Sequence, residues 1–391
     1  MGGFRKNKGE LVAIDCISGK AVKYRIDHGG VAYAGPAEGE MENLPFAGPG
    51  LVDLQINGVN GIDFNDTSLS EDGLLAAARY LLARGVTTFF PTVITNSQEN
   101  AGRILSVIDR ACRAMPEVAG SIGGIHLEGP FISESDGYRG AHDRKYVRAP
   151  DWDLFCSFQR ASGNRIKIIT ISPEWEDSVG FIRRCRKNGV IVGIAHSRAG
   201  TGRIAEAVDA GARLSTHLGN SVPLMLPRHP NIIWDQLAED RLFATIVADG
   251  YHLPDSFIRV VLKVKKSRTL LISDATCFAG RAPGTYRTHI GGEVVLEEGG
   301  RLSMKGEQGL LAGAARLLPE NIEYLISKDI AKLSRAWYMA SCGPAEFAGL
   351  RKTCKRPGDY SDMVVFGLGD GKINVSRVIR QGEIVSKSED N

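Results

Sequence analysis

The sequence lacks the features that mark secreted, membrane and nucleic-acid-binding proteins. None of its seven cysteines stands in a CxxC pair, and the odd number favours reduced thiols over a disulfide framework. No run reaches the ~18 uncharged apolar residues of a membrane helix, and the N-terminal MGGFRKNKGE has no apolar signal core. The net charge of +3 is too small for a nucleic-acid or membrane-surface protein. We therefore expect a soluble cytoplasmic protein without nucleic-acid or membrane partners.

The composition is that of a large folded protein. Hydrophobic residues make up 43% of the 391 residues and charged residues 24%, which excludes wholesale disorder. At ~100 to 200 residues per domain, the length predicts two or three domains. Neither a repeat nor a low-complexity linker is visible.

Eight apolar runs alternate with amphipathic segments along most of the chain. The runs are mostly continuous in apolar residues, which is typical of strands buried on both faces of a parallel sheet. Segments between them, such as 70–85 and 173–189, carry a cap or proline at the start and a glycine at the end, as helices do. The eight runs span residues 50–55, 85–93, 121–128, 166–172, 190–196, 212–218, 243–249 and 269–274.

This alternation predicts an α/β fold, a (β/α)8 barrel of the TIM type over residues 49–355. The active site of such a barrel lies at the C-terminal ends of its strands. Short strand-like stretches in 1–48 and 356–391 are expected to pair into a small β-sandwich domain. Residues 284–305 are predicted to form a hairpin inserted after the eighth strand.

Five titratable residues fall at the predicted strand ends. Glu128 ends the third run, His196 the fifth, His217 the sixth and Asp274 the eighth, while His252 follows the seventh. A single histidine at a strand end is more often structural than functional. Because all five would converge on one rim of the barrel, the sequence predicts a catalytic site there.

Glu128, His196 and His217 form a suitable donor set for Zn²⁺ or a similar divalent ion. A carboxylate and two imidazoles leave a coordination position open for water, as in catalytic zinc sites. Glu128 could instead pair with a lysine or arginine that the sequence does not reveal. Asp274 is a candidate general base, and its alternative role is that of an acid at a helix N-cap.

The ordered motifs resemble the N-acetylglucosamine-6-phosphate deacetylase family of the amidohydrolase superfamily. The resemblance runs from the first barrel strand to RPGDYSDMVVF (356–366), and HLEGPF is its most specific part. It implies a metal-dependent deacetylase with its ligands at Glu128, His196 and His217 and its acid/base at Asp274. The main motifs are LVDLQINGVNGIDFND (51–66), HLEGPF (126–131), GAH (140–142), IAHSRA (194–199), THLGNSVP (216–223), ADGYH (248–252) and ISDAT (272–276).

The chain departs from most amidohydrolases at the end of the first strand. Where they carry an HxH pair for a second metal, this sequence has Gln55, Ile56 and Asn57, and amides are poor ligands for transition metals. We therefore expect one divalent ion per subunit, zinc or alternatively Fe, Co or Mn. Gln55 and Asn57 are expected to act as hydrogen-bonding residues around the site. His126 shares strand parity with Glu128 and is expected to orient the ligands.

The resemblance also implies the contacts to substrate. His252 would polarise the acetyl carbonyl, His142 would bind the sugar, and Asn220 and Ser221 would lie near the phosphate. Arg228 would clamp the phosphate, reaching into the neighbouring site of a homodimer, since a guanidinium matches phosphate oxygens. The alternatives are a solvent-facing loop histidine at 252 and an ordinary surface cation at 228.

The resulting hypothesis is hydrolysis of the acetamide of an N-acetylamino-sugar phosphate, N-acetylglucosamine 6-phosphate above all. The sequence departs from the family pattern around the substrate, so other substrates stay open: N-acetylgalactosamine 6-phosphate, or an unphosphorylated or cyclic amide. A non-catalytic binding protein with this fold is the alternative from another class. The departures are Gly219, Ser221, His229, Thr276 and Cys277.

Overall fold

A computed structural model describes residues 9–27, 30–37, 43–288, 292–306, 310–350 and 360–387. The first four residues of the RPGDYSDMVVF motif and Cys354 lie outside these ranges. No helix within them is long and apolar enough to cross a membrane. The expectation of reduced thiols is wrong for Cys342, which is disulfide-bonded. Free thiols are Cys16, Cys112, Cys156, Cys185 and Cys277.

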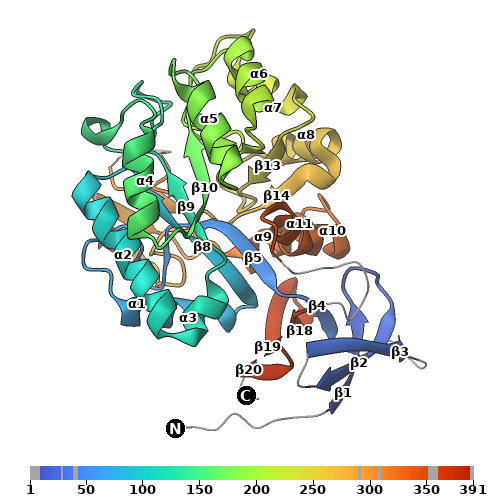
Figure 1. The fold of residues 1–391 in the computed structure, drawn as a ribbon. Coiled ribbons are helices and arrows are strands. Elements are labelled where there is room, and N and C mark those ends of the chain that lie inside the picture. Colours follow the sequence, from blue (N-terminus) through green and yellow to red (C-terminus); the bar gives the residue numbers. More distant parts are fainter. Residues whose placement is uncertain are drawn as a thin grey trace.

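Eight parallel strands form the predicted barrel (Figure 1). Each of the eight apolar runs overlaps one strand, and neighbours in sequence are neighbours in the sheet. The first strand meets the segment that follows the last strand through individual hydrogen bonds, such as Asp274 N to Gln55 O at 2.9 Å, so the barrel is nearly closed. The strands are β5 (Leu51–Ile56), β8 (Val86–Ile94), β9 (Ile125–Glu128), β10 (Ile166–Ile171), β11 (Ile191–Ile194), β12 (Leu214–Ser215), β13 (Phe243–Ile246) and β14 (Thr269–Leu271).

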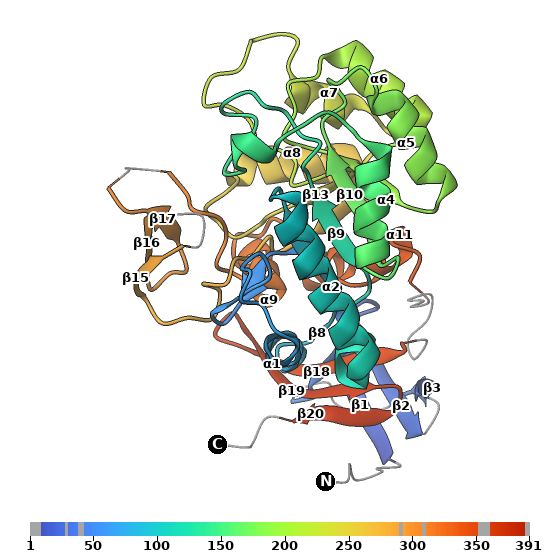
Figure 2. The ribbon, with the colours of Figure 1, turned by 60° about the vertical axis from the view of Figure 1, so that its left-hand side comes forward.

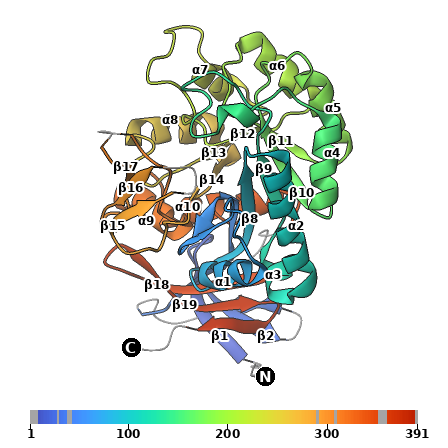
Figure 3. The same ribbon diagram turned by 90° about the vertical axis from the view of Figure 1, so that its left-hand side faces the viewer.

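Helices follow the barrel strands and cover the outside of the barrel (Figure 3). Local sequence explains where several of them begin: the Ser70 hydroxyl accepts the Gly73 N–H at 3.1 Å, and Ser97 does the same for Asn100. The helices are α1 (Glu71–Leu82), α2 (Gln98–Ala114), α3 (Pro116–Ser121), α4 (Trp152–Ala161), α5 (Ser178–Lys187), α6 (Thr201–Ala210), α7 (Ile232–Ala238), α8 (Asp255–Lys265), α9 (Leu318–Ser327), α10 (Leu333–Met339) and α11 (Cys342–Phe347). Two short 3-10 helices lie at Arg144–Tyr146 and Lys266–Arg268, and β6 (Gly58–Val59) pairs with β7 (Ile62–Asp63).

The barrel interior changes from apolar to polar along the strands. Its lower part is one buried apolar cluster that includes Ile168 and Leu214. Two residues further along these strands, and on the same face, come the buried Thr170 and Thr216. The apolar part separates the polar side chains at the C-terminal rim from solvent at the N-terminal ends of the strands.

The N- and C-terminal segments pair in one mixed sheet, as predicted for the small β domain. Its seven strands run in the order β20-β19-β18-β4-β1-β2-β3, with β1 and β4 parallel. Side chains from both ends of the chain, such as Tyr24 and Met363, share one apolar core. The exact boundaries of the domain stay a prediction. The strands are β1 (Gly9–Asp15), β2 (Ala21–Asp27), β3 (Gly30–Pro36), β4 (Phe46–Pro49), β18 (Asp362–Gly369), β19 (Lys372–Arg380) and β20 (Glu383–Lys387).

A buried tryptophan joins this sheet to the barrel. The Trp337 ring stacks on Phe366 with ring centroids 4.3 Å apart, and its Nε1–H donates to Pro49 O at 2.9 Å. Gly48 lies directly against it: a Cβ there would be 2.6 Å from Trp337 Nε1 and 2.4 Å from Cys16 Sγ. Only glycine therefore fits at this position.

The segment predicted as an inserted hairpin carries three strands, β15 (Gly284–Arg287), β16 (Glu293–Leu296) and β17 (Leu302–Met304). They form an antiparallel sheet that projects from one side of the barrel (Figure 2). Arg316 fastens it to the loop after β13, because its guanidinium donates to Gly299 O and to Asp249 O at 2.9 Å each.

Candidate active site

Four of the five predicted residues lie at the C-terminal ends of their strands, and His252 lies in the loop after β13. Glu128 is the last residue of β9, and His196, His217 and Asp274 follow β11, β12 and β14 by two or three residues. The backbone of these three adopts positive φ angles of 47°, 34° and 48°. Such a conformation is uncommon for residues other than glycine and concentrates at functional sites, where the surrounding fold sustains it.

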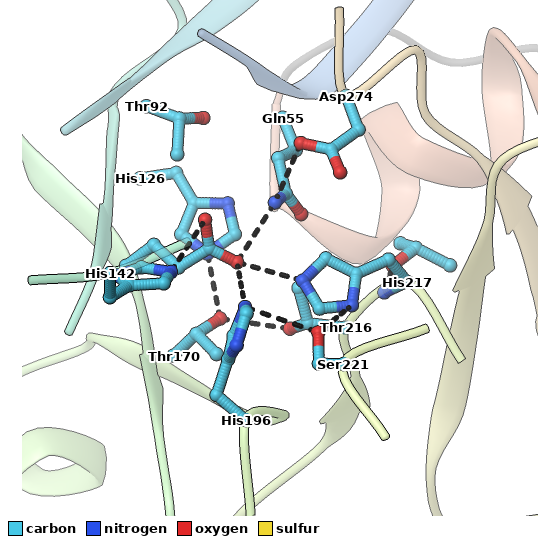
Figure 4. Close-up of polar contacts among 12 residues, drawn as sticks. Gln55, Thr92, His126, His142, Thr170, His196, Thr216, His217, Ser221 and Asp274 are labelled. Carbon is cyan, nitrogen blue, oxygen red and sulfur yellow. Dashed lines mark hydrogen bonds and ion pairs between the residues drawn. The ribbon is translucent and has the colours of Figure 1, made fainter. Parts of the chain in front are cut away.

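Glu128, His196 and His217 come together as predicted. Their ligand atoms lie within 4.8 Å of one another and all three residues are buried. Glu128 Oε1 is 2.8 Å from His217 Nε2 and 3.4 Å from His196 Nε2. Figure 4 shows the two imidazoles pointing toward a common centre. Three donors from three strands thus face one point at the rim.

The charge of Glu128 is matched by this cluster and not by a basic side chain. Among the residues that the structure describes, no lysine or arginine forms an ion pair with Glu128. Burial alone would raise the pKa of Glu128, but hydrogen bonds from His196 and His217 hold it well below its usual value. An ionised buried carboxylate between two imidazoles fits a divalent cation, which prefers this donor set.

Gln55 and Asn57 hold Asp274 beside the cluster. Gln55 Nε2 donates to Glu128 Oε1 at 3.0 Å and to Asp274 Oδ1 at 3.1 Å, and Asn57 Nδ2 donates to the same Asp274 oxygen at 2.8 Å. Their own side-chain oxygens are buried without a hydrogen-bond partner among the described residues. Burial raises the pKa of Asp274. This aspartate caps no helix of the described chain, so its predicted alternative as an N-cap acid does not apply.

His142 lies against Glu128 and His196. Its Nε2 is 4.0 Å from Glu128 Oε2, and its ring meets that of His196 edge to face at 4.4 Å between centroids. The Thr95 hydroxyl and His142 Nδ1 are 2.8 Å apart, which fixes the ring. Burial lowers the pKa of His142 to about 3, so the ring is neutral and can donate or accept a single hydrogen bond at each nitrogen.

His252 is held by Asp249, which the sequence interpretation did not single out. His252 Nδ1 is 2.7 Å from Asp249 Oδ2, and the other carboxylate oxygen accepts the backbone N–H of both Tyr251 and His252. Burial would raise the pKa of Asp249, but the bond to His252 lowers it. The ADGYH motif contains both residues, so the Asp–His spacing was a signal that could have been used. Because Nδ1 faces Asp249, only Nε2 of His252 remains for a substrate.

The residues predicted to lie near the phosphate are in the loop after β12, and their surroundings differ from one another. The Ser221 hydroxyl is 3.1 Å from His196 Nε2 and 3.2 Å from His217 Nδ1, so it lies against the cluster of Glu128, His196 and His217. Asn220 Nδ2 is buried and has no partner among the described residues. Arg228 is exposed, and no described hydrogen bond or ion pair joins its guanidinium to the cluster.

His126 lies deeper in the barrel than the cluster, toward the N-terminal ends of the strands, and is buried. Its Nδ1 is 3.1 Å from Leu54 O and its Nε2 is 2.8 Å from the Thr170 hydroxyl. Burial lowers the pKa of His126 to about 4, so it carries no charge at neutral pH. Within the described chain it makes no direct hydrogen bond to Glu128, His196 or His217, so its role in orienting the ligands stays a prediction.

The Amidohydrolase family profile matches residues 46–385, which is most of the chain. The chain belongs to the amidohydrolase family. It is 31% identical to the N-acetylglucosamine-6-phosphate deacetylase of Bos taurus, over 88% of this chain and 84% of that protein. The enzyme of the same name from Bacillus subtilis is 31% identical over 71% of this amidohydrolase and 69% of the relative. The family indicated by the motifs is thereby confirmed.

Solved structures agree with this assignment. A mutant N-acetyl-D-glucosamine-6-phosphate deacetylase from Mycobacterium smegmatis, in complex with N-acetyl-D-glucosamine-6-phosphate, matches this amidohydrolase with a TM-score of 0.84. The two are 25% identical, and the match covers 97% of this chain and 99% of that one. The Thermotoga maritima enzyme matches with a TM-score of 0.81 and 26% identity, over 97% and 99% of the two chains. The barrel with its added small sheet is therefore the amidohydrolase fold.

Proposed function

We propose that this protein hydrolyses the acetamide of N-acetylglucosamine 6-phosphate to glucosamine 6-phosphate and acetate. The observation that carries the proposal is the buried cluster of Glu128, His196 and His217 with Asp274 beside it. Relatives at 31% identity bear the name of this deacetylase, and a structural relative at 25% identity was solved with this sugar phosphate. A non-catalytic role is disfavoured, because all four of these side chains are present and assembled.

Glu128, His196 and His217 would hold one divalent ion, for which we propose zinc. Such an ion supplies Lewis acidity toward a carbonyl oxygen and lowers the pKa of water. A second ion is not expected, because Gln55 and Asn57 use their amide N–H groups on the carboxylates of Glu128 and Asp274. Their unpartnered oxygens are acceptors that can orient a water molecule.

Asp274 would carry both proton transfers. It accepts a proton from the attacking water as the C–O bond forms, and it donates that proton to the departing nitrogen as the C–N bond breaks. Burial raises the pKa of this carboxyl, which favours its holding the proton between the two steps. Gln55 and Asn57 both donate to Oδ1, which leaves Oδ2 for the water and the leaving group.

His252 would stabilise the oxyanion through Nε2, and Asp249 would act as its positioning residue. Because Nδ1–H is donated to Asp249, a ring that also donates from Nε2 must carry a positive charge, which the Asp249 carboxylate stabilises. We expect Asp249→Asn to lower kcat by ~10-fold or more with little change in KM, since loss of an oxyanion donor costs ~100-fold. Steady-state kinetics measures this.

The control for Asp249 is the same substitution in a His252→Ala background. If Asp249 acts only through His252, Asp249→Asn has almost no further effect there, because the two losses are not additive. An equal loss of kcat in both backgrounds would show that Asp249 merely supports the loop.

Arg228 would bind the phosphate group of the substrate that occupies the site of the neighbouring subunit in a homodimer. Next to it, Leu224 and Met225 are 106% and 87% exposed, although apolar side chains of this size are usually covered. An exposed guanidinium beside uncovered apolar side chains fits a loop that packs against a second copy of the chain. Dimer formation would then complete the substrate site.

The cytoplasmic location predicted from the sequence remains part of the proposal.

A substrate panel tests the phosphate contact. We expect N-acetylglucosamine 6-phosphate to be preferred over N-acetylglucosamine, and Arg228→Ala to lower kcat/KM ~10- to 100-fold for the phosphorylated sugar only. Arg183→Ala, which removes an exposed arginine of α5, is the matched control. Acetate release across phosphorylated and unphosphorylated N-acetylhexosamines, including the galacto sugar, measures both. Equal rates with and without phosphate would contradict the clamp and indicate another amide substrate.

Subunit mixing tests whether the clamp acts across the dimer. Arg228→Ala and Asp274→Asn chains are each impaired, but a mixed dimer contains one site with both residues intact. Activity should therefore rise when the two variants are co-expressed. If Arg228 serves its own subunit, no intact site forms and no activity is recovered.

A further inference from the structure

Two buried threonine hydroxyls contact each other on the side of the proposed metal site that faces the barrel interior. Thr170 of β10 and Thr216, which directly follows β12, are 0% and 2% exposed, and their Oγ1 atoms are 2.9 Å apart (Figure 4). Thr170 Oγ1 is also 2.8 Å from His126 Nε2, while His126 Nδ1 is 3.1 Å from Leu54 O. One chain of hydrogen bonds therefore links the interior faces of β5, β9, β10 and β12.

The contact between the two hydroxyls depends on a glycine in the strand between them. β11 separates β10 from β12, so the two backbones are two strand spacings, or about 10 Å, apart. Gly193 of β11 pairs with Thr170, and a Cβ on it would lie 2.4 Å from Thr216 Oγ1 and 3.0 Å from Thr170 Oγ1. Any other residue would displace the hydroxyls, since packed backbone and side chains leave no space.

Both ends of this hydrogen-bonded chain adjoin metal-site residues. His126 is two residues before Glu128 on β9, and Thr216 directly precedes His217. β10 contributes no ligand, yet it pairs with β9 with Thr170 opposite Glu128. The Gly129 N–H donates to Thr170 O. Thr170 therefore contacts one residue before Glu128 in the sequence, His126, and one residue after it, Gly129.

We propose that Thr170, Thr216 and Gly193 act as positioning residues that fix the distance between Glu128 and His217 and so raise the affinity of the site for its metal. The proposal rests on the metal site proposed above and adds residues that touch neither metal nor substrate. Side chains that orient metal ligands typically change metal affinity 10- to 100-fold when they are replaced.

Thr170→Val keeps the shape of the side chain and removes its hydroxyl. It leaves His126 Nε2 and the Thr216 hydroxyl without their partner, and we expect the Zn²⁺ dissociation constant to rise ~10- to 100-fold. Thr170→Ser restores the hydroxyl and should stay close to the parent protein. Gly193→Ala should weaken Zn²⁺ binding by displacing the hydroxyl pair. Adding Thr216→Val to Thr170→Val should cost little more, because both remove the same contact.

Thr269→Val is the matched control. Thr269 is a fully buried threonine on the barrel strand β14, and its hydroxyl has no hydrogen-bond partner among the described residues. This variant should bind Zn²⁺ as the parent does. The measurement is titration of metal-free protein with Zn²⁺ in competition with a chromophoric chelator, together with the thermal midpoint of the metal-free form.

The outcomes separate the two proposals. If Thr170→Val and Thr269→Val bind Zn²⁺ equally well, the positioning role is wrong, and a lower thermal midpoint alone would mean that the hydroxyls only stabilise the barrel. If Thr170→Val does not fold, Gly193→Ala and Thr216→Val decide in the same way. If the parent protein itself binds no Zn²⁺ or other divalent ion, the proposed function and this inference both fall.

Discussion

Asp274→Asn should abolish turnover while the protein keeps its metal. General acid–base catalysis contributes ~10²- to 10⁴-fold, and this carboxylate is proposed to serve in both proton transfers, so we expect kcat to fall by ~10³-fold or more. An amide neither accepts the proton of the attacking water nor supplies one to the departing nitrogen. Acetate release under saturating substrate measures the loss.

The structure explains why this substitution should leave the site intact. Gln55 and Asn57 both donate to Oδ1 of Asp274, and an amide oxygen at that position accepts the same two hydrogen bonds. The new NH₂ group then takes the place of Oδ2, which receives no described hydrogen bond. Metal content and thermal midpoint should therefore match those of the parent. Full activity in this variant would show that another group moves the protons.

The barrel could be predicted because its strands are buried on both faces. Each run of continuous apolar residues overlaps a strand, and the polar residue at the end of a run can mark the rim, as Glu128 does. The strand ends were less predictable. The run at 212–218 contains only Leu214–Ser215 as strand, since the chain turns into a positive φ at His217 to aim its ring at Glu128. No residue pattern in the sequence predicts that turn.

The partners of the site residues were mostly beyond prediction. Asp249 could have been found, because it stands three residues before His252 in the same motif. Thr95, by contrast, meets His142 from 47 positions away, and Thr170 meets Thr216 from 46 positions away. These contacts arise only when the barrel closes, and a lone threonine in a strand is ordinarily read as a good strand former. The need for glycine at position 193 becomes clear only in the structure, where a Cβ would collide with the hydroxyls of Thr170 and Thr216.

His217→Ala should remove the metal and lower the stability of the protein together. The variant loses a donor and leaves the buried Glu128 carboxylate without its nearest partner, at 2.8 Å. Leaving a buried charged group without its hydrogen-bond partner costs ~1 to 3 kcal/mol or more. We expect the Zn²⁺ dissociation constant to rise by more than ~100-fold, beyond the effect of residues that only orient ligands. Metal analysis after dialysis and chelator competition measure this.

A chelator distinguishes loss of metal from simple loss of packing. Bound metal stabilises the folded state in proportion to its binding free energy, so EDTA should lower the thermal midpoint of the parent protein. It should have no such effect on His217→Ala, which holds no metal to lose, whereas the exposed His229→Ala should respond as the parent does. If His217→Ala retains stoichiometric metal, the ligand set is wrong. Because His196 and Glu128 share the same centre, His196→Ala should reproduce both results.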